Sequence, residues 1–220
     1  MPLSKMQENA VESFAKWAMR SDNAERVMEP TEKYATAFAD NHGLTLPDLF
    51  QKLEAAGLLL PVTHFALSQL AAEKSTEAVE NLTDEYLRRR GWREAPLGRQ
   101  TLQAIRDAKL SVFEVIDGKD GESLSVRDLM ADDAPITVVT PHVRVDELRD
   151  QGLAGRLAQL SGELTFILTP LTMPIAHIRT VAEAWKATPA DEQTEDRVGT
   201  LIVNQFLESL WAQADTATNG

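Results

Sequence analysis

The spacing of apolar residues along this chain changes twice. Up to residue 109, and again from residue 174, apolar residues recur every three or four positions, as on one face of an amphipathic helix. Between residues 110 and 168 they form short runs separated by Gly, Pro and Asp, a pattern typical of β-strands. The sequence therefore predicts an α+β protein with an N-terminal helical domain (1–109), a small β-domain (110–173) and a C-terminal helical segment (174–220).

The N-terminal region is predicted to contain several amphipathic helices. Met6–Met19 carries one apolar face, Ser21–Asn23 reads as a break, and Glu29–Pro30 restarts a helix. Thr45 is the natural N-cap of the next helix. Ser75–Arg90 is predicted to be a further amphipathic helix.

The β-domain is predicted to hold five short strands. Two runs flank the turn Asp117–Glu122, a β-branched run covers Ile136–Thr140, and Leu153–Leu160 pairs with Leu164–Leu168 around Ser161–Glu163. Five short strands suit a small SH3-like or OB-like barrel, because closure hides the edges that a flat sheet would expose.

The terminal helix is predicted over Val198–Ala214 and carries a strongly apolar seam. A lone helix cannot leave so much apolar surface in water, so this face must pack on its own chain or on a second copy. The link from Thr188 is long enough for the helix to fold back, which favours intrachain packing, with a homodimer through Val198–Ala214 as the alternative.

Composition restricts the classes of partner. The formal net charge is −12 and the isoelectric point is about 4.8, so the long-range field disfavours nucleic acid and anionic membranes. The chain contains no Cys, which excludes disulfides and thiolate metal sites. The stretch 55–62 is too short to span a bilayer, and no signal peptide is recognised at the N-terminus. We expect a cytoplasmic protein with no membrane contact.

One segment of this acidic chain is locally basic. Arginines in the last turn before Gly91 complement the helix dipole, and docking on the chain's own carboxylates would explain them fully. The alternative is a patch that contacts phosphate or nucleic acid. Its candidate residues are Arg88, Arg89, Arg90, Trp92, Arg93, Arg99 and Arg106.

A second pair of charged residues stands out in the β-domain. Arg127 and Asp128 are adjacent in a predicted strand, so they point to opposite faces and cannot pair with each other. We expect Asp128 to form a structural cross-strand ion pair with Arg156, with a ligand-anchoring role as the alternative.

No catalytic, cofactor or metal site is predicted. The four histidines lack the spacing of metal ligands, and a Gly-x-Ser-x-Gly elbow is absent. No glycine pair lies between a strand and a helix, where a phosphate-binding loop needs it. The histidines are His42, His64, His142 and His177.

Short motifs in the β-domain resemble a known family. Ser111–Val115, a Gly-containing turn and Leu124–Leu129 resemble the "yEV…G…lrDLl" pattern of a family of uncharacterised bacterial proteins, and Leu148–Leu157 is similar to its "l…gd.l.aRl" segment. The resemblance covers roughly residues 85–173. Many members carry a C-terminal, Cys-rich SEC-C zinc motif, which this Cys-free chain cannot form. The resemblance implies a fold and no activity.

The predicted function is therefore that of a non-enzymatic, cytoplasmic interaction or regulatory protein of unknown protein partner. A nucleic-acid-associated protein that uses the Arg88–Arg106 segment is the alternative. The third hypothesis is an enzyme whose catalytic residues are dispersed along the sequence.

Overall fold

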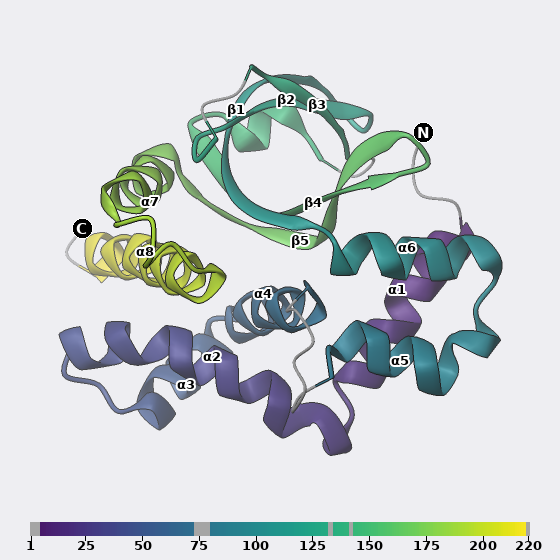
Figure 1. Cartoon of the computed structure of the whole chain (residues 1–220). Helices are drawn as coiled ribbons and strands as arrows, with labels where there is room; N and C mark the ends of the chain where they lie inside the picture. The colour runs from purple at the N-terminus through teal and green to yellow at the C-terminus, as the bar shows by residue number, and fades with distance from the viewer. Residues whose placement is uncertain (1–4, 73–79, 132–133, 141–142, 219–220) are drawn as a thin grey trace.

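A closed β-barrel lies against a layer of helices drawn from both ends of the chain (Figure 1). The computed structural model describes residues 5–72, 80–131, 134–140 and 143–218. Helices α7 and α8 cover one side of the barrel, α4 crosses beneath it, and α1, α5 and α6 form a group on the other side. The predicted α+β class with a five-stranded barrel is confirmed.

The five strands have the order β1-β2-β3-β5-β4, and β4 closes on β1. The β3–β5 pair is parallel and all the other pairs are antiparallel. This order, with parallel β3 and β5, is that of an OB-like barrel. The strands are β1 Lys109–Lys119, β2 Ser123–Asp128, β3 Ile136–Val139, β4 Gln151–Leu160 and β5 Glu163–Pro174.

The barrel has an apolar interior, because every second residue of each strand points inward. Phe113 lies inside it, in edge-to-face contact with Phe166, with ring centroids 5.5 Å apart. The short 3-10 helix η2 (Val145–Leu148) joins β3 to β4 and adds Leu148 to the same interior cluster. One end of the barrel is thereby plugged by the chain itself.

The helices largely follow the predicted pattern. Thr45 is the N-cap of α3, as predicted, and its side chain accepts a hydrogen bond from the backbone N–H of Asp48 at 3.3 Å. The helical elements are α1 Lys5–Ala18, α2 Ser21–Asn41, α3 Leu46–Ala55, α4 Leu59–Ala72, α5 Leu82–Arg90, η1 Gly91–Arg93, α6 Pro96–Arg106, α7 Ile175–Ala187 and α8 Glu195–Thr218.

Two predicted helix boundaries differ from the structure. The restart at Glu29–Pro30 is wrong, since α2 already begins at Ser21 and continues through Pro30. Buried Val27 and Tyr34 anchor the helix on either side of the proline, and this packing outweighs the missing hydrogen bond. The predicted start at Ser75 lies outside the described residues, and α5 begins after its N-cap Asn81.

The terminal helix packs within its own chain. Val198, Ile202 and Phe206 of α8 share a core cluster with Phe38 of α2 and Val181 of α7. The apolar seam that suggested a homodimer is therefore covered by α2 and α7, and self-association through it stays a prediction.

The same core cluster joins the helices to the outer face of the barrel. It includes Val112 of β1, Ala154 of β4 and Leu171 of β5 beside residues of α2, α4, α7 and α8. The strands run from Lys109 to Pro174, close to the predicted limits of the β-domain. The division into three domains itself stays a prediction.

No single helix in the described part of the chain is long and apolar enough to cross a membrane. Helices α3 and α4 together reach that length and apolarity, but they meet at 114°. Much of α4 is buried in the core, where its apolar side chains pack against the chain itself.

His64 of α4 makes folding stability depend on pH. Burial lowers the pKa of His64 below its ordinary value of 6.5, so the folded state binds this proton less readily than the unfolded state. Stability is therefore expected to be complete above about pH 6.5 and to fall as the pH drops below it. Urea unfolding at pH 7.5 and 5.5 should show a smaller pH effect in His64→Gln than in the unchanged protein. Equal pH effects in the two proteins would contradict this account.

Candidate functional site

Four arginines line one small polar cavity, here called the arginine pocket. The cavity has a volume of about 220 Å³, and no carboxylate contributes to its lining. It forms where the α1–α2 junction meets the C-terminal end of α5. Its lining residues are Trp17, Arg20, Asn23, Arg89, Arg90 and Arg93.

Most of these arginines lack an acidic partner. Arg89 pairs with Glu85, one turn earlier in α5, at 3.1 Å. Arg20, Arg90 and Arg93 form no salt bridge with any residue that the structure describes. Three guanidinium groups therefore line this pocket without a salt bridge of their own to offset their mutual repulsion.

The walls of the arginine pocket are rigid. Trp17 is buried and its ring lies 5.3 Å from that of Tyr86, measured between centroids. Asn23 donates a hydrogen bond from its amide to the backbone oxygen of Trp17 at 3.1 Å. The wall formed by Trp17 and Asn23 is thus fixed by packing and hydrogen bonding before a ligand binds, which reduces the entropy lost on binding.

A wider cavity of about 490 Å³ adjoins the arginine pocket and shares Arg20, Arg90 and Arg93 with it. Its one lining carboxylate, Glu94, accepts a hydrogen bond from the hydroxyl of Tyr86 at 2.5 Å. Burial and this hydrogen bond raise the pKa of Tyr86 well above its ordinary range, so the tyrosine stays a neutral donor. Glu94 is thus held by Tyr86 rather than by an arginine.

The other arginines of the predicted basic segment dock on the chain itself. Arg88 makes two hydrogen bonds to the carboxylate of Glu80, at 3.0 and 2.6 Å. Arg106 lies 3.1 Å from carboxylate oxygens of both Asp84 and Asp107. These hydrogen bonds raise the pKa of Arg88 and of Arg106.

Arg99 and Trp92 complete the segment. Arg99 donates to the backbone oxygen of Glu94 at 2.7 Å and so closes the turn between α5 and α6. Trp92 is 73% exposed, and the guanidinium of Arg93 lies 4.8 Å from the centroid of its ring. The predicted segment therefore separates into docked arginines and the arginine pocket.

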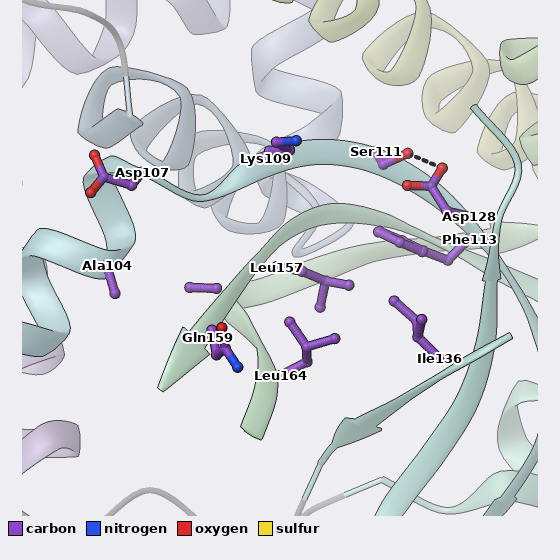
Figure 2. Close-up of a pocket in the computed structure, with 11 residues that line it drawn as sticks. Ala104, Asp107, Lys109, Ser111, Phe113, Asp128, Ile136, Leu157, Gln159 and Leu164 are labelled. Carbon is purple, nitrogen blue, oxygen red and sulfur yellow. Dashed lines mark hydrogen bonds between the residues drawn. The ribbon is translucent and has the colours of Figure 1, made fainter. Parts of the chain in front are cut away.

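The predicted ion pair between Asp128 and Arg156 is wrong. Asp128 ends β2 on the inner face of the barrel, where Ser111 donates a hydrogen bond to its Oδ1 at 2.5 Å (Figure 2). Arg156 is on β4 and points outward, to Gln69 of α4 and Glu195 of α8. The two side chains lie on opposite faces of the barrel wall, so they cannot meet.

Arg156 is the centre of a buried polar network. Its side chain is completely buried, and Nη2 donates to Glu195 Oε2 at 2.5 Å and to Gln69 Oε1 at 2.7 Å. Nη1 donates to the backbone oxygen of Ala108 at 2.7 Å. These bonds tie α8, α4 and the start of β1 to one strand of the barrel, which gives Arg156 a structural role.

Two of the histidines, His42 and His177, contact side chains of α8. His42 contacts Glu208 at 3.0 Å and stacks on Phe38, and His177 contacts Gln205 at 2.9 Å. His142 lies outside the described residues. Within the described ranges, no group of three or more His, Asp or Glu is placed to hold a metal ion.

Comparison with protein-family models, curated proteins and solved structures finds no match to this chain. The resemblance of the β-domain to the uncharacterised bacterial family therefore stays a prediction. Function must be argued from the site alone.

Proposed function

We propose that this chain is a non-enzymatic, cytoplasmic interaction or regulatory protein that uses the arginine pocket to bind a partner carrying a compact anion, such as a phosphate group. The single observation behind the proposal is that Arg20, Arg90 and Arg93 converge on one polar cavity without a carboxylate partner in the described structure.

Guanidinium groups match phosphate oxygens in geometry and charge. An arginine can offer two parallel N–H donors to a phosphate, and several arginines around one cavity can satisfy all of its oxygens. The net charge of −12 means that the rest of the surface repels anions, so an anion would bind selectively at the arginine pocket. A compact anion would offset the repulsion between the arginines and fit a cavity of about 220 Å³.

A binding role agrees better with the described side chains than a catalytic one. The hydroxyl of Ser111 in the barrel-end wall is bonded to Asp128, and none of the described histidines lines the cavity beside it. A serine usually needs an adjacent general base to become nucleophilic. Arginine itself stays protonated and serves to bind and orient.

The proposal is tested by titrating the protein with inorganic pyrophosphate in a calorimeter. The double variant Arg90→Gln/Arg93→Gln should bind at least about tenfold more weakly, since each lost charged hydrogen bond weakens binding by a factor of this order. Binding should also weaken as salt is added. Arg88→Gln is the matched control, because Arg88 sits in the same turn but is bonded to Glu80.

Affinity of the control should stay within about twofold of the unchanged protein, since it removes no pocket donor. Undetectable pyrophosphate binding to the folded protein, or equal binding by the double variant, would refute the anion site. Circular dichroism of all three proteins separates lost binding from lost folding.

Single-stranded nucleic acid is the second candidate, and exposed Trp92 is the observation that favours it. An exposed aromatic ring beside arginines is the usual platform for stacking bases next to a phosphate backbone. A labelled single-stranded oligonucleotide added to the same proteins and to Trp92→Ala distinguishes the two candidates. Salt-sensitive binding that is lost in Trp92→Ala supports nucleic acid, whereas pyrophosphate binding that Trp92→Ala leaves intact supports the compact anion.

A further inference from the structure

A second cavity opens at the end of the barrel that η2 does not plug. It has a volume of about 440 Å³, within the range of small-molecule sites. Apolar side chains from four strands form its floor, with Phe113 at the bottom and Ile136, Leu157 and Leu164 around it (Figure 2). Ser111, Asp128, Lys109 and Gln159 form its rim.

The carboxylate at this rim is fixed in position. Its Oδ1 accepts hydrogen bonds from Ser111 Oγ and from the backbone N–H groups of Met130 and Ala131, at 2.5, 2.9 and 3.2 Å. Its Oδ2 accepts none from the part of the chain that the structure describes. Asp128 therefore presents one oriented, unused acceptor at the cavity.

Two more polar groups reach the rim without partners. The side chains of Lys109 and Gln159 make no hydrogen bond or salt bridge with any described residue, although both residues line the cavity. Lys109 and Ser111 are two residues apart on β1, which places their Cα atoms about 7 Å from each other on one face. Asp107 also lines the cavity, but its carboxylate is paired with Arg106 at 3.1 Å.

We propose that this barrel-end cavity binds a small zwitterion with an apolar side chain, of the kind presented by a free apolar amino acid or a short apolar peptide. The ligand's ammonium group donates to Asp128 Oδ2, and its carboxylate accepts from the ammonium of Lys109. Its side chain lies on Phe113, Leu157 and Leu164. This site is separate from the arginine pocket and does not rest on the function proposed there.

The carboxylate of Asp128, the ammonium of Lys109 and the apolar floor together select this class of ligand. A carboxylate only accepts hydrogen bonds and a lysine ammonium only donates them. The ligand must therefore carry a positively charged donor and a negatively charged acceptor. Asp128 is bonded to Ser111, and Lys109 lies two residues before Ser111 on β1, so the two opposite charges belong to one rim. The apolar floor then adds affinity through surface removed from water.

The test uses the full chain and four probes: phenylalanine, the dipeptide Leu-Phe, phenethylamine and 3-phenylpropionate. Calorimetry should show saturable binding of phenylalanine or of Leu-Phe. The tighter of the two identifies whether the natural ligand is a free amino acid or a short peptide. Phenethylamine lacks the carboxylate and 3-phenylpropionate lacks the amine, so each should bind at least about tenfold more weakly.

Three variants locate the site. Asp128→Asn should weaken phenylalanine and dipeptide binding at least about tenfold, and Lys109→Met should do the same while leaving phenethylamine binding unchanged. Lys109 is exposed, so Lys109→Met keeps the test valid if Asp128→Asn does not fold. Arg127→Met is the matched control, because Arg127 adjoins Asp128 but points outward to Glu114.

The proposal would be overturned if neither zwitterion bound saturably to the folded protein at about 10 mM. This concentration is on the order of a hundred times the dissociation constant of a site of moderate affinity. Binding that survives Lys109→Met unchanged would overturn it as well. A loss of binding in Arg127→Met as large as in Lys109→Met would also count against this cavity.

Discussion

Replacing Arg156 by alanine is expected to lower the free energy of unfolding by about 3 to 5 kcal/mol, as when one partner of a buried charged network is removed. The change leaves Gln69 and the backbone oxygen of Ala108 buried without their donor. It also creates a cavity in the wall of the barrel, because Arg156 is fully buried. Urea unfolding monitored by circular dichroism measures the loss.

A double-mutant cycle of Arg156→Ala, Glu195→Gln and the combined variant separates the ion pair from the rest of the network. Glu195→Gln alone should cost less than Arg156→Ala, since the side chain of Glu195 is 58% exposed and water can take its place. Arg149→Ala is the control, because Arg149 pairs with Asp146 at a site where both side chains are 78% exposed. That exposed pair should contribute less than about 1 kcal/mol. Equal losses of unfolding free energy in Arg156→Ala and Arg149→Ala would show that the buried network adds nothing to the stability of the protein.

Replacing Gly152 by alanine is expected to destabilise the protein by about 2 to 3 kcal/mol, as does overpacking in other cores. A Cβ atom on Gly152 would lie 2.6 Å from Cγ1 of Ile178 and 2.9 Å from the backbone oxygen of Phe113. Ile178 is a fully buried residue of α7 and the oxygen belongs to the neighbouring strand, so neither can move away freely. Either α7 must shift or the β1–β4 pairing must open.

Gly91→Ala provides the matched control for the same chemical change. Gly91 has φ −58°, and the nearest atom to an added Cβ is Leu87 Cδ2 at 3.4 Å. Alanine is compatible with that backbone, so the change should be neutral or stabilise by up to about 1 kcal/mol through the unfolded state. Thermal unfolding of both variants compares them directly. If Gly152→Ala were as stable as Gly91→Ala, the contact between α7 and the barrel would rearrange at almost no cost in free energy.

Both expected losses concern the junction between the barrel and the helices. Arg156 joins the barrel to α4 and α8, while Gly152 allows α7 to approach β4 closely. The arginine pocket lies away from this junction, at the α1–α5 corner, whereas the barrel-end cavity adjoins it, because Lys109 and Leu157 flank Ala108 and Arg156. Variants in the arginine pocket can therefore be tested without disturbing the contacts between elements that hold the fold together.

Local patterns in the sequence determined the elements. The change of apolar period located the barrel, Thr45 marked a helix start, and the seam of Val198–Ala214 identified a helix that must be covered. Such features depend on residues a few positions apart, whose relative placement follows from backbone geometry alone. Two boundaries failed among the described helices: α2 begins at Ser21, because packing around Pro30 overrode its local preference, and α5 begins only after its N-cap Asn81.

Side-chain partners were decided by the tertiary structure. Arg156 meets Glu195, which is 39 positions away in sequence, because β4 turns that side chain outward toward α8. Arg20 joins Arg90 and Arg93 only because α1 packs beside α5, and no local signal connects residues so far apart. The sequence by itself determined where helices and strands lie, since that choice is made within a few residues. Which charges meet depends on the face each element presents to distant neighbours, and only the folded chain sets this.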